Sequence, residues 1–135
     1  MNNDKGYTLL ELLIVLAILA LIAGIAVPQV MSIFSRAKRD TAKIQIDSLA
    51  SDLEFYKLDT GRYPDEKVGL TALIEAPENV ENWNGPYIPR STGLNDPWGT
   101  PYKYNYARSK NRVQIFSLGA DGQEGGEGDN ADIRN

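Results

Sequence analysis

The first half of the fold is decided by the stretch Lys5-Gly6-Tyr7-Thr8-Leu9-Leu10-Glu11 and by the sixteen uncharged residues that follow it, from Leu12 to Val27. As an α-helix, the span from Leu9 to Val27 would be about 28 Å long at about 1.5 Å per residue. That length is close to the thickness of the hydrocarbon core of a bilayer. The sequence therefore predicts one membrane-spanning helix.

Glu11 is the ionisable residue inside this predicted span. An ionisable side chain loses hydration in a bilayer, and insertion scales put the cost of Asp, Lys or Arg at the helix centre at roughly 2.5–3.5 kcal/mol. Two interpretations stay open from the residues alone. Either Glu11 lies near the membrane edge and extends its carboxylate to water, or another subunit supplies a partner of opposite charge.

A secretory signal peptide is the competing interpretation of the same segment. However, the apolar run is longer than the usual h-region of about 7–15 residues. The small residue Gly6, which follows the basic residue Lys5, lies before the apolar run. A signal peptidase site of the A-x-A kind would lie after the apolar run. We therefore expect the helix to be retained in the mature chain.

The composition narrows the range of functions. The chain has no cysteine and no histidine, which excludes a disulfide framework and an imidazole for a catalytic triad, a proton shuttle or a typical zinc site. Its formal net charge of −4 arises in residues 119–135, where five acidic residues stand against Arg134. The sequence has no basic patch with interleaved aromatic residues, so we predict that nucleic acid is not a partner.

Beyond Pro28 the pattern of apolar and charged residues predicts an amphipathic helix. It would continue the membrane helix, so that one helix would run from about Tyr7 to about Leu58. A kink or local loosening is expected at Pro28, because proline lacks a backbone hydrogen-bond donor. Asp59-Thr60-Gly61 would end it, with Gly61 in the left-handed conformation that suits glycine. We expect the apolar face to consist of Val30, Ile33, Phe34, Ala37, Ile44, Leu49, Leu53 and Tyr56.

The remaining part of the chain predicts a small antiparallel sheet. A short helix is expected near residues 69–75 and a tight turn at Asp96-Pro97-Trp98-Gly99. Two strands, at about 102–106 and 113–117, would pair as a hairpin around 109–111. The aromatic residues of this part are expected to pack against the long helix; they are Tyr63, Trp98, Tyr102 and Tyr104.

The stretch from Asp121 to Asp132 is rich in glycine and acidic residues, and Ala131 is its apolar residue. Composition alone favours a solvated, disordered tail, because glycine and carboxylates bury little apolar surface. The alternative is a loop around Ca²⁺, a hard cation that takes about six to eight oxygen ligands from carboxylates and carbonyls. The spacing does not match an EF-hand.

The junction of Gly6 with an aromatic residue, followed by Thr-Leu-Leu-Glu, the apolar run and Pro28, resembles the signal of type IV pilins and type II secretion pseudopilins. The resemblance implies that a prepilin peptidase cleaves between Gly6 and Tyr7, which removes the leader 1–6, and N-methylates Tyr7. The family usually has Phe at this position. The resemblance also implies that the Glu11 carboxylate attracts the free amino terminus of a neighbouring subunit during assembly.

Further motifs are similar to those of the G-type major pseudopilin of type II secretion. They are Tyr56-Lys57-Leu58-Asp59-Thr60-Gly61-Arg62-Tyr63-Pro64, Gly69-Leu70 with Ala72-Leu73, Asp96-Pro97-Trp98-Gly99 and Phe116-Ser117-Leu118-Gly119-Ala120-Asp121-Gly122. Together they cover nearly the whole chain. Major pilins of adhesive fibres usually have a cysteine-bridged C-terminal loop, which this chain lacks, and this favours a pseudopilin.

The resemblance implies a pilin-like α+β fold, in which a long N-terminal helix packs on a small C-terminal antiparallel sheet. Residues 7–28 would span the membrane, residues 29–61 would form the amphipathic continuation, and residues 62–135 would form the globular region. The resemblance further implies a calcium loop at 118–132. Carboxylate oxygens would come from Asp121, Asp129 and Asp132, backbone carbonyls from Leu118 and Gln123, and Glu124 and Glu127 would be solvated.

The function implied by the resemblance is that of a non-enzymatic subunit that polymerises into the periplasmic pseudopilus of a type II secretion system and helps export folded proteins across the outer membrane. The implied partners are further copies of the chain, minor pseudopilins, the inner-membrane assembly platform, the prepilin peptidase and membrane lipid before assembly. The implied location is the bacterial inner membrane, with a single pass and the C-terminal domain in the periplasm. Positive charges just beyond the apolar run, Arg36, Lys38 and Arg39, would by themselves favour the opposite topology.

Two alternatives remain open. One is a type IV pilin subunit of an adhesion or DNA-uptake fibre. The other is a membrane-tethered hydrolase that uses paired carboxylates, but acidic residues confined to a glycine-rich loop make a poor general acid and base.

Overall fold

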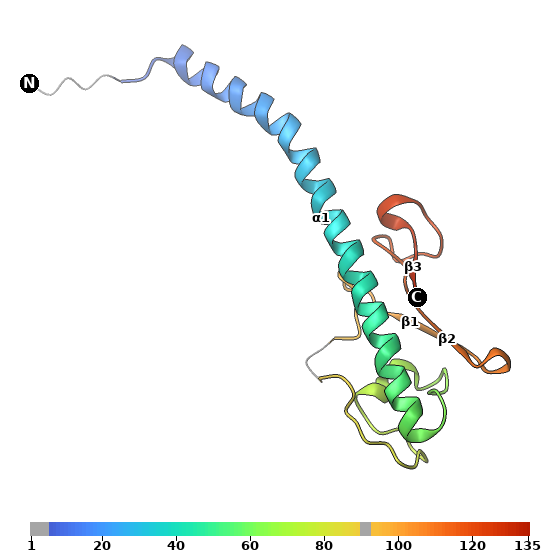
Figure 1. Cartoon of the computed structure of the whole chain (residues 1–135). Coiled ribbons are helices and arrows are strands. Elements are labelled where there is room, and N and C mark those ends of the chain that lie inside the picture. The colour runs from blue at the N-terminus through green and yellow to red at the C-terminus, as the bar shows by residue number, and fades with distance from the viewer. Residues whose placement is uncertain (1–5, 90–92) are drawn as a thin grey trace, which may run out of the picture. The chain divides into compact units, whose positions relative to one another are not determined.

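The computed structural model describes residues 6–89 and 93–135. Its elements, in chain order, are the helix α1 (Leu9–Thr60), the 3₁₀ helix η1 (Gly69–Leu73), the strand β1 (Lys103–Ala107), the 3₁₀ helix η2 (Arg108–Lys110), the strand β2 (Arg112–Ser117), the 3₁₀ helix η3 (Gly128–Asn130) and the strand β3 (Ile133–Arg134) (Figure 1). Two compact units share α1: one ends at Ser35, and the other runs from Arg36 to Asn135.

The predicted long helix is confirmed. It runs from Leu9 to Thr60 and remains helical through Pro28, and the kink at that residue stays a prediction. The helix ends as expected, because Gly61 takes a φ of +80° and its amide donates a 2.8 Å hydrogen bond to the Lys57 carbonyl. Glycine adopts this left-handed conformation without the steric cost that a Cβ would add.

The part of α1 that belongs to the globular unit buries one line of side chains. These residues recur at steps of four and three, which places them on one face of a helix: Ala42, Ile46, Leu49, Leu53 and Tyr56. The expectation for Ile44 is wrong, since 69% of its surface is exposed. Two residues along a helix turn it by about 200°, so Ile44 faces away from the line that begins at Ala42. Val30, Ile33 and Phe34 are also exposed.

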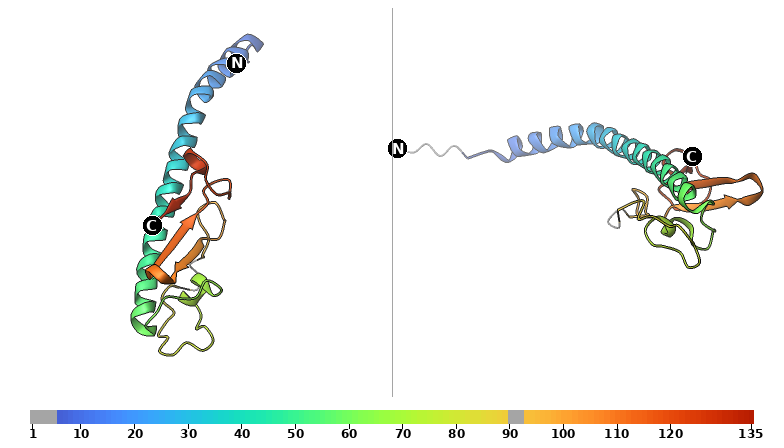
Figure 2. Two further views of the ribbon diagram at one scale, coloured as in Figure 1. Left: turned by 90° about the vertical axis from the view of Figure 1, so that its right-hand side faces the viewer. Right: turned by 60° about the horizontal axis from the view of Figure 1, so that its bottom comes forward.

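The globular unit contains a three-stranded antiparallel sheet with the order β1-β2-β3. The predicted hairpin is confirmed, with Lys103 opposite Phe116 and Ala107 opposite Arg112. Its turn consists of η2 followed by Asn111, which takes a left-handed conformation with a φ of 47°. The third strand was not predicted, and it pairs Ile133 with Ser117. The sheet lies along the second half of α1 (Figure 2).

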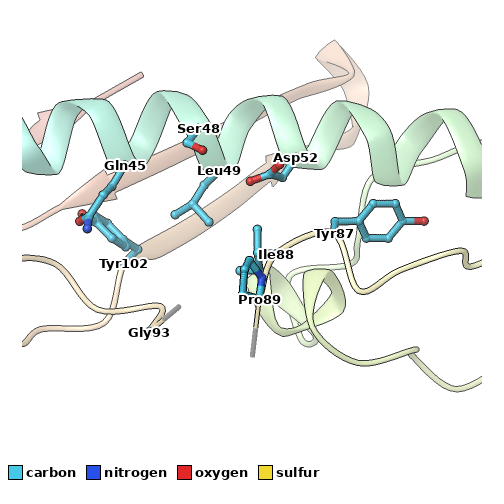
Figure 3. Close-up of a pocket in the computed structure, with 9 residues that line it drawn as sticks. All are labelled: Gln45, Ser48, Leu49, Asp52, Tyr87, Ile88, Pro89, Gly93 and Tyr102. Carbon is cyan, nitrogen blue, oxygen red and sulfur yellow. The ribbon is translucent and has the colours of Figure 1, made fainter. Parts of the chain in front are cut away.

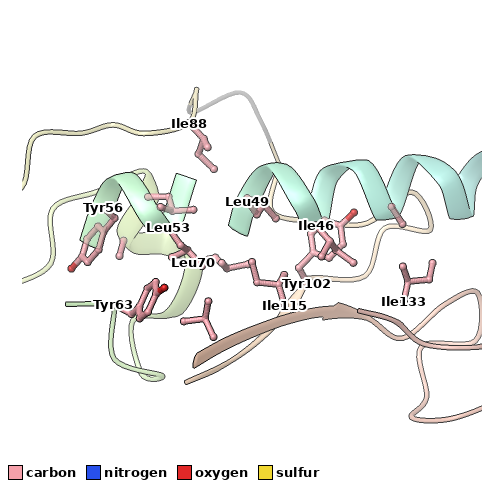
Figure 4. Close-up of a cluster of buried hydrophobic side chains, with 14 residues drawn as sticks. Ile46, Leu49, Leu53, Tyr56, Tyr63, Leu70, Ile88, Tyr102, Ile115 and Ile133 are labelled. Carbon is pink, nitrogen blue, oxygen red and sulfur yellow. The ribbon is translucent and has the colours of Figure 1, made fainter. Parts of the chain in front are cut away.

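The core fills the space between this helix face and the sheet (Figure 4). Leu53 and Ile115 are fully buried in it. The expected aromatic packing is confirmed: Tyr63 and Tyr102 are buried, and Trp98 and Tyr104 are partly buried against the same core. The short helix expected at 69–75 is η1, a 3₁₀ helix that contributes Leu70, Ala72 and Leu73 to the core.

The predicted tight turn at 96–99 is built around a buried carboxylate. Asp96 is 5% exposed, and its Oδ1 accepts hydrogen bonds from the amides of Trp98 (3.0 Å) and Thr100 (2.9 Å). Its Oδ2 accepts a 2.5 Å hydrogen bond from the Ser117 hydroxyl, whose oxygen in turn accepts one from the Gly119 amide. The turn therefore fixes the end of β2 and the start of the C-terminal loop.

The unit that ends at Ser35 contains only helix among its described elements. Its apolar side chains from Leu9 to Val27 are about half exposed or more. Among the residues that the structure describes, α1 is the one helix that is long and apolar enough to cross a membrane. The predicted single span is consistent with this finding.

Candidate assembly helix and C-terminal acidic loop

The first turn of α1 is closed by a capping box, a reciprocal pair of hydrogen bonds at a helix N-terminus. The Thr8 hydroxyl accepts a 3.2 Å hydrogen bond from the Glu11 amide. In return, the Glu11 Oε2 accepts hydrogen bonds from the amide of Thr8 (2.8 Å) and from its hydroxyl (2.9 Å). The Glu11 carboxylate therefore faces the N-terminal end of the helix.

The predicted cleavage site lies directly before this cap. Gly6 and Tyr7 are exposed and precede the first helical residue, outside any helix or strand. Residues 1–5 of the predicted leader lie outside the described residues. Within residues 6–89 and 93–135, no ion pair involves Glu11. The processing site and the role of Glu11 in assembly stay predictions.

The acidic stretch at the C-terminus is folded, unlike the disordered tail that composition alone favours. The Ala120 amide donates a 2.9 Å hydrogen bond to the Asp129 carbonyl, and the Asp132 amide donates a 3.2 Å hydrogen bond to the Gly125 carbonyl. Gly119 and Gly126 lie so close to Asn130 that an added Cβ would be 2.8 Å and 2.6 Å from its backbone. Glycine is therefore required where the two arms of the loop meet.

The structure places the predicted calcium ligands along this loop but does not gather their carboxylates. Asp121 Oδ1 accepts a 3.1 Å hydrogen bond from the Gln123 amide, Asp129 lies in η3, and Leu118 is buried at the start of the loop. Asp132 Oδ2 accepts a 2.8 Å hydrogen bond from Arg134. This bond is the main cause that lowers the pKa of Asp132.

The chemistry of these donors fits Ca²⁺, because carboxylate and carbonyl oxygens are the ligands that this hard cation prefers. The backbone also fits, since the loop returns Asp129 beside Ala120. In the described part of the chain, however, no three acidic side chains converge closely enough to hold a metal ion. Calcium at 118–132 stays a prediction, and Glu124 and Glu127 are exposed, as expected.

Two basic residues on α1 that were not assigned to the site contact the loop. The Arg39 guanidinium donates hydrogen bonds to the carbonyls of Gly128 (2.7 Å) and Ala131 (2.9 Å). The Lys43 ammonium donates a 2.8 Å hydrogen bond to the Arg134 carbonyl. Their spacing of four residues indicates that both side chains lie on the same face of the helix. This spacing does not identify a backbone partner about ninety residues away in the sequence.

A groove of about 260 Å³ lies between α1 and the segment before the 96–99 turn (Figure 3). Among its described lining residues, Asp52 supplies the carboxylate, and burial raises the pKa of that side chain. Leu49 and Tyr102 form part of its wall. Since the sequence contains neither histidine nor cysteine, the groove has no imidazole or thiol with which to build a nucleophilic site.

Family models match both parts of the chain. The model described as "Prokaryotic N-terminal methylation motif" matches residues 1–27, and the model described as "Type II secretion system (T2SS), protein G" matches residues 29–135. The chain belongs to the type II secretion system protein G family. The motif at residues 1–27 is the segment that contains the predicted processing site and Glu11.

Relatives and a solved structure agree with this family. "Type II secretion system core protein G" of Pseudomonas aeruginosa is 42% identical over 135 residues, which covers 98% of this chain and 94% of the relative. The protein of the same description from Vibrio cholerae serotype O1 is 42% identical over 138 residues, with 100% and 93% covered. The crystal structure of the major pseudopilin from the type 2 secretion system of enterohaemorrhagic Escherichia coli matches with a TM-score of 0.62 and 33% identity, over 78% of this chain and 91% of that one.

These matches confirm the pilin-like α+β fold and favour the pseudopilin over the type IV pilin alternative. As a member of the protein G family, the chain is a pseudopilin, a structural subunit of the pseudopilus in type II secretion. None of these matches favours a pilin subunit of an adhesion or DNA-uptake fibre.

Proposed function

We propose that the chain is a single-pass protein of the bacterial inner membrane that polymerises, with its C-terminal domain in the periplasm, into a pseudopilus that helps export folded proteins across the outer membrane. The observation that carries this proposal is the exposure of the apolar residues from Leu9 to Val27 around α1. A helix that is apolar on all sides is buried in a membrane or within an assembly. Lipid would cover it before assembly and further copies of the chain afterwards.

Maturation by a prepilin peptidase is the first proposed step. Cleavage after Gly6 would free the amino group of Tyr7, which would then be N-methylated. The match of the N-terminal methylation motif to residues 1–27 supports this step, as does the exposure of both residues at the junction. N-terminal mass analysis of the membrane-extracted protein should find N-methyl-tyrosine first. Retention of Met1 would contradict the proposal.

The proposed partner of Glu11 is the freed amino terminus of a neighbouring copy. A carboxylate inside an apolar segment is costly, and an ammonium group of opposite charge would offset that cost only once the two chains are in register. The orientation of Glu11 toward the N-terminal end of α1 supports this pairing. Minor pseudopilins and the inner-membrane assembly platform are the other proposed partners.

Calcium binding by the C-terminal loop is also part of the proposal. The ligands would be the carboxylates of Asp121, Asp129 and Asp132 and the carbonyls of Leu118 and Gln123. An all-oxygen donor set on a glycine-rich loop supports Ca²⁺ over softer metals. When bound, the ion would neutralise these carboxylates and hold together a loop that buries little apolar surface.

The calcium proposal can be tested on the full chain in detergent micelles. An ion that binds only the folded state stabilises it by mass action, so the melting temperature should fall in chelator and recover with added Ca²⁺. Asp121→Ala should melt like the chelated protein and ignore added Ca²⁺, whereas the matched variant Glu124→Ala should still respond. A wild-type melting curve that is the same with and without chelator would contradict calcium binding.

A further inference from the structure

The basic residue Arg39 is tied to the far end of the chain. Its Nη1 donates hydrogen bonds to the carbonyls of Gly128, at 2.7 Å, and of Ala131, at 2.9 Å. These carbonyls belong to the first residue of η3 and to the residue that follows it. One guanidinium therefore contacts the 3₁₀ turn at both ends.

Lys43 provides a second contact one helical turn along α1. Its ammonium donates a 2.8 Å hydrogen bond to the carbonyl of Arg134 in β3. Ala42, between the two basic residues, is fully buried, so the helix meets the rest of the globular unit closely at this level. Arg39 and Lys43 thus hold residues 128–134 from the helix side.

The segment that Arg39 contacts, residues 128–131, contains one proposed calcium ligand and is followed directly by another. Asp129 lies inside η3, and its carbonyl accepts the Ala120 hydrogen bond that closes the loop. Asp132 directly follows Ala131, whose carbonyl Arg39 contacts. Fixing the carbonyls of residues 128 and 131 therefore restricts the backbone from which both carboxylates project.

Apart from the contacts with Arg39, hydrogen bonds between residues of the loop restrict its conformation, among them the one from Ala120 to Asp129 and the one from the Gly125 amide to Asp132. The residues from Gln123 to Asn130 are exposed. Five glycines in the loop take positive φ values, and glycine also adopts such values readily in an unfolded chain. Hydrogen bonds from a charged donor are stronger than those between neutral groups. The contacts of Arg39 are thus charge-assisted hydrogen bonds that tie this stretch of the loop to α1.

We propose that Arg39 is a positioning residue of the C-terminal loop, which holds η3 against α1 so that Asp129 and Asp132 are placed for cation binding. Lys43 acts as the second anchor. The inference rests on the proposed calcium function for its cation, but the contacts that hold the loop do not require the ion. Arg39 would not be a ligand, since a guanidinium carries no acceptor for a cation.

Three variants of the full chain in detergent micelles test the proposal. Arg39→Gln removes the charge and the forked donor. Arg39→Lys keeps the charge but offers a compact ammonium with a different geometry. Lys38→Gln is the matched control, because Lys38 is an exposed basic residue on the same helical turn.

Hydrogen exchange in chelator measures the loop without the ion. Arg39→Gln should raise exchange of the amides at 119–132 by about tenfold and leave those of β1 and β2 near the wild-type rates. Arg39→Lys should fall between Arg39→Gln and the wild type, and Lys38→Gln should match the wild type. Unchanged loop exchange in Arg39→Gln, or an equal rise in the loop and in both strands, would overturn the proposal.

Calorimetric titration with Ca²⁺ separates the two proposals. If the wild type binds Ca²⁺, Arg39→Gln should bind it about tenfold more weakly and Arg39→Lys less weakly than that. Equal affinity in the wild type and Arg39→Gln would overturn the positioning role while calcium binding stands. A wild type that takes up no Ca²⁺ would overturn the calcium function, and with it the placement of Asp129 and Asp132 for a cation.

Discussion

The two halves of α1 share a backbone conformation but differ in what covers their side chains. In the half that precedes Arg36, Leu16 keeps 55% of its surface exposed, and its apolar neighbours are similar. In the half that belongs to the globular unit, Leu53 is fully buried among residues of the same unit. Among the described residues, one helix therefore carries apolar side chains that are buried within the chain and apolar side chains that stay exposed.

The difference shows that burial within the chain accounts for only one half of the helix. Covering a leucine side chain stabilises the covered state by about 1.5–3 kcal/mol, and the globular unit obtains this from its own sheet. Within the described residues, the apolar side chains of the preceding half stay about half exposed or more. The proposed cover for them is lipid before assembly and other copies of the chain afterwards.

The largest expected effect comes from Glu11→Ala. The substitution keeps the segment apolar, so the protein should insert and be processed, but it removes the proposed partner of a neighbouring amino terminus. Crosslinking in membranes should show nearly complete loss of multimers. The melting temperature of the globular unit should be unchanged. Glu11→Asp should assemble to an intermediate extent, because its shorter side chain keeps the charge but reaches less far. If Glu11→Ala formed multimers at the wild-type level, the pairing of Glu11 with a neighbouring amino terminus would be contradicted.

A matched pair of leucine variants compares the two halves directly. Leu53→Ala should destabilise the globular unit by about 2–5 kcal/mol, because it leaves a cavity in the core. Leu16→Ala should change the unfolding free energy of that unit by less than about 0.5 kcal/mol. Chemical denaturation in detergent, followed by tryptophan fluorescence, measures both. Equal losses of stability would show that the halves are not energetically separate.

The sequence was sufficient to predict the elements whose signals are local. The apolar run, the stop at Gly61 and the alternating strands are all set by neighbouring residues, and each was confirmed. The error at Ile44 has a different cause. Ile44 lies five residues before Leu49, outside the steps of four and three that the buried residues follow, and it was assigned to the apolar face on its apolar character alone.

The C-terminal loop was the least predictable part. Ile133 pairs with Ser117 in a strand of two residues, which is too short to give a periodic pattern. Arg39 contacts carbonyls of residues 128 and 131, and backbone acceptors have no sequence signal at all. The proposed ligands rest on resemblance, because the path of the loop depends on these long-range contacts.

Asp96→Ala should have the next largest effect. It would leave the amides of Trp98 and Thr100 and the hydroxyl of Ser117 without their acceptor. Leaving buried donors unsatisfied costs about 1–3 kcal/mol. Denaturation of the variant should show a loss in this range, and Asp40→Ala, at an exposed site on α1, should show almost none. A neutral Asp96→Ala would mean that the turn is not held by this carboxylate.

The smallest expected effect is a dependence on alkaline pH. Burial raises the pKa of Tyr104 above its usual value of 10.0, so the folded state favours the neutral phenol. The resulting stability is complete below pH 10.0 and is lost as pH rises through the raised pKa of the folded state. Tyr104→Phe should cost about 0.5–1.5 kcal/mol at neutral pH, since the hydroxyl donates to the Pro64 carbonyl. As pH rises above 10.0, the free energy of unfolding should fall less in the variant than in the wild type. If it fell by the same amount in both proteins, the alkaline pH dependence would not come from Tyr104.

The central claim is that the apolar half of α1 is covered by other copies of the chain. A photocrosslinking residue at Leu16, introduced into the full chain and activated in cells with the secretion system, tests this most directly. The account predicts adducts of twice the chain mass that contain only this protein and that disappear when Glu11→Ala is added. Adducts with lipid alone, or an identical yield of dimers in the presence of Glu11→Ala, would contradict it.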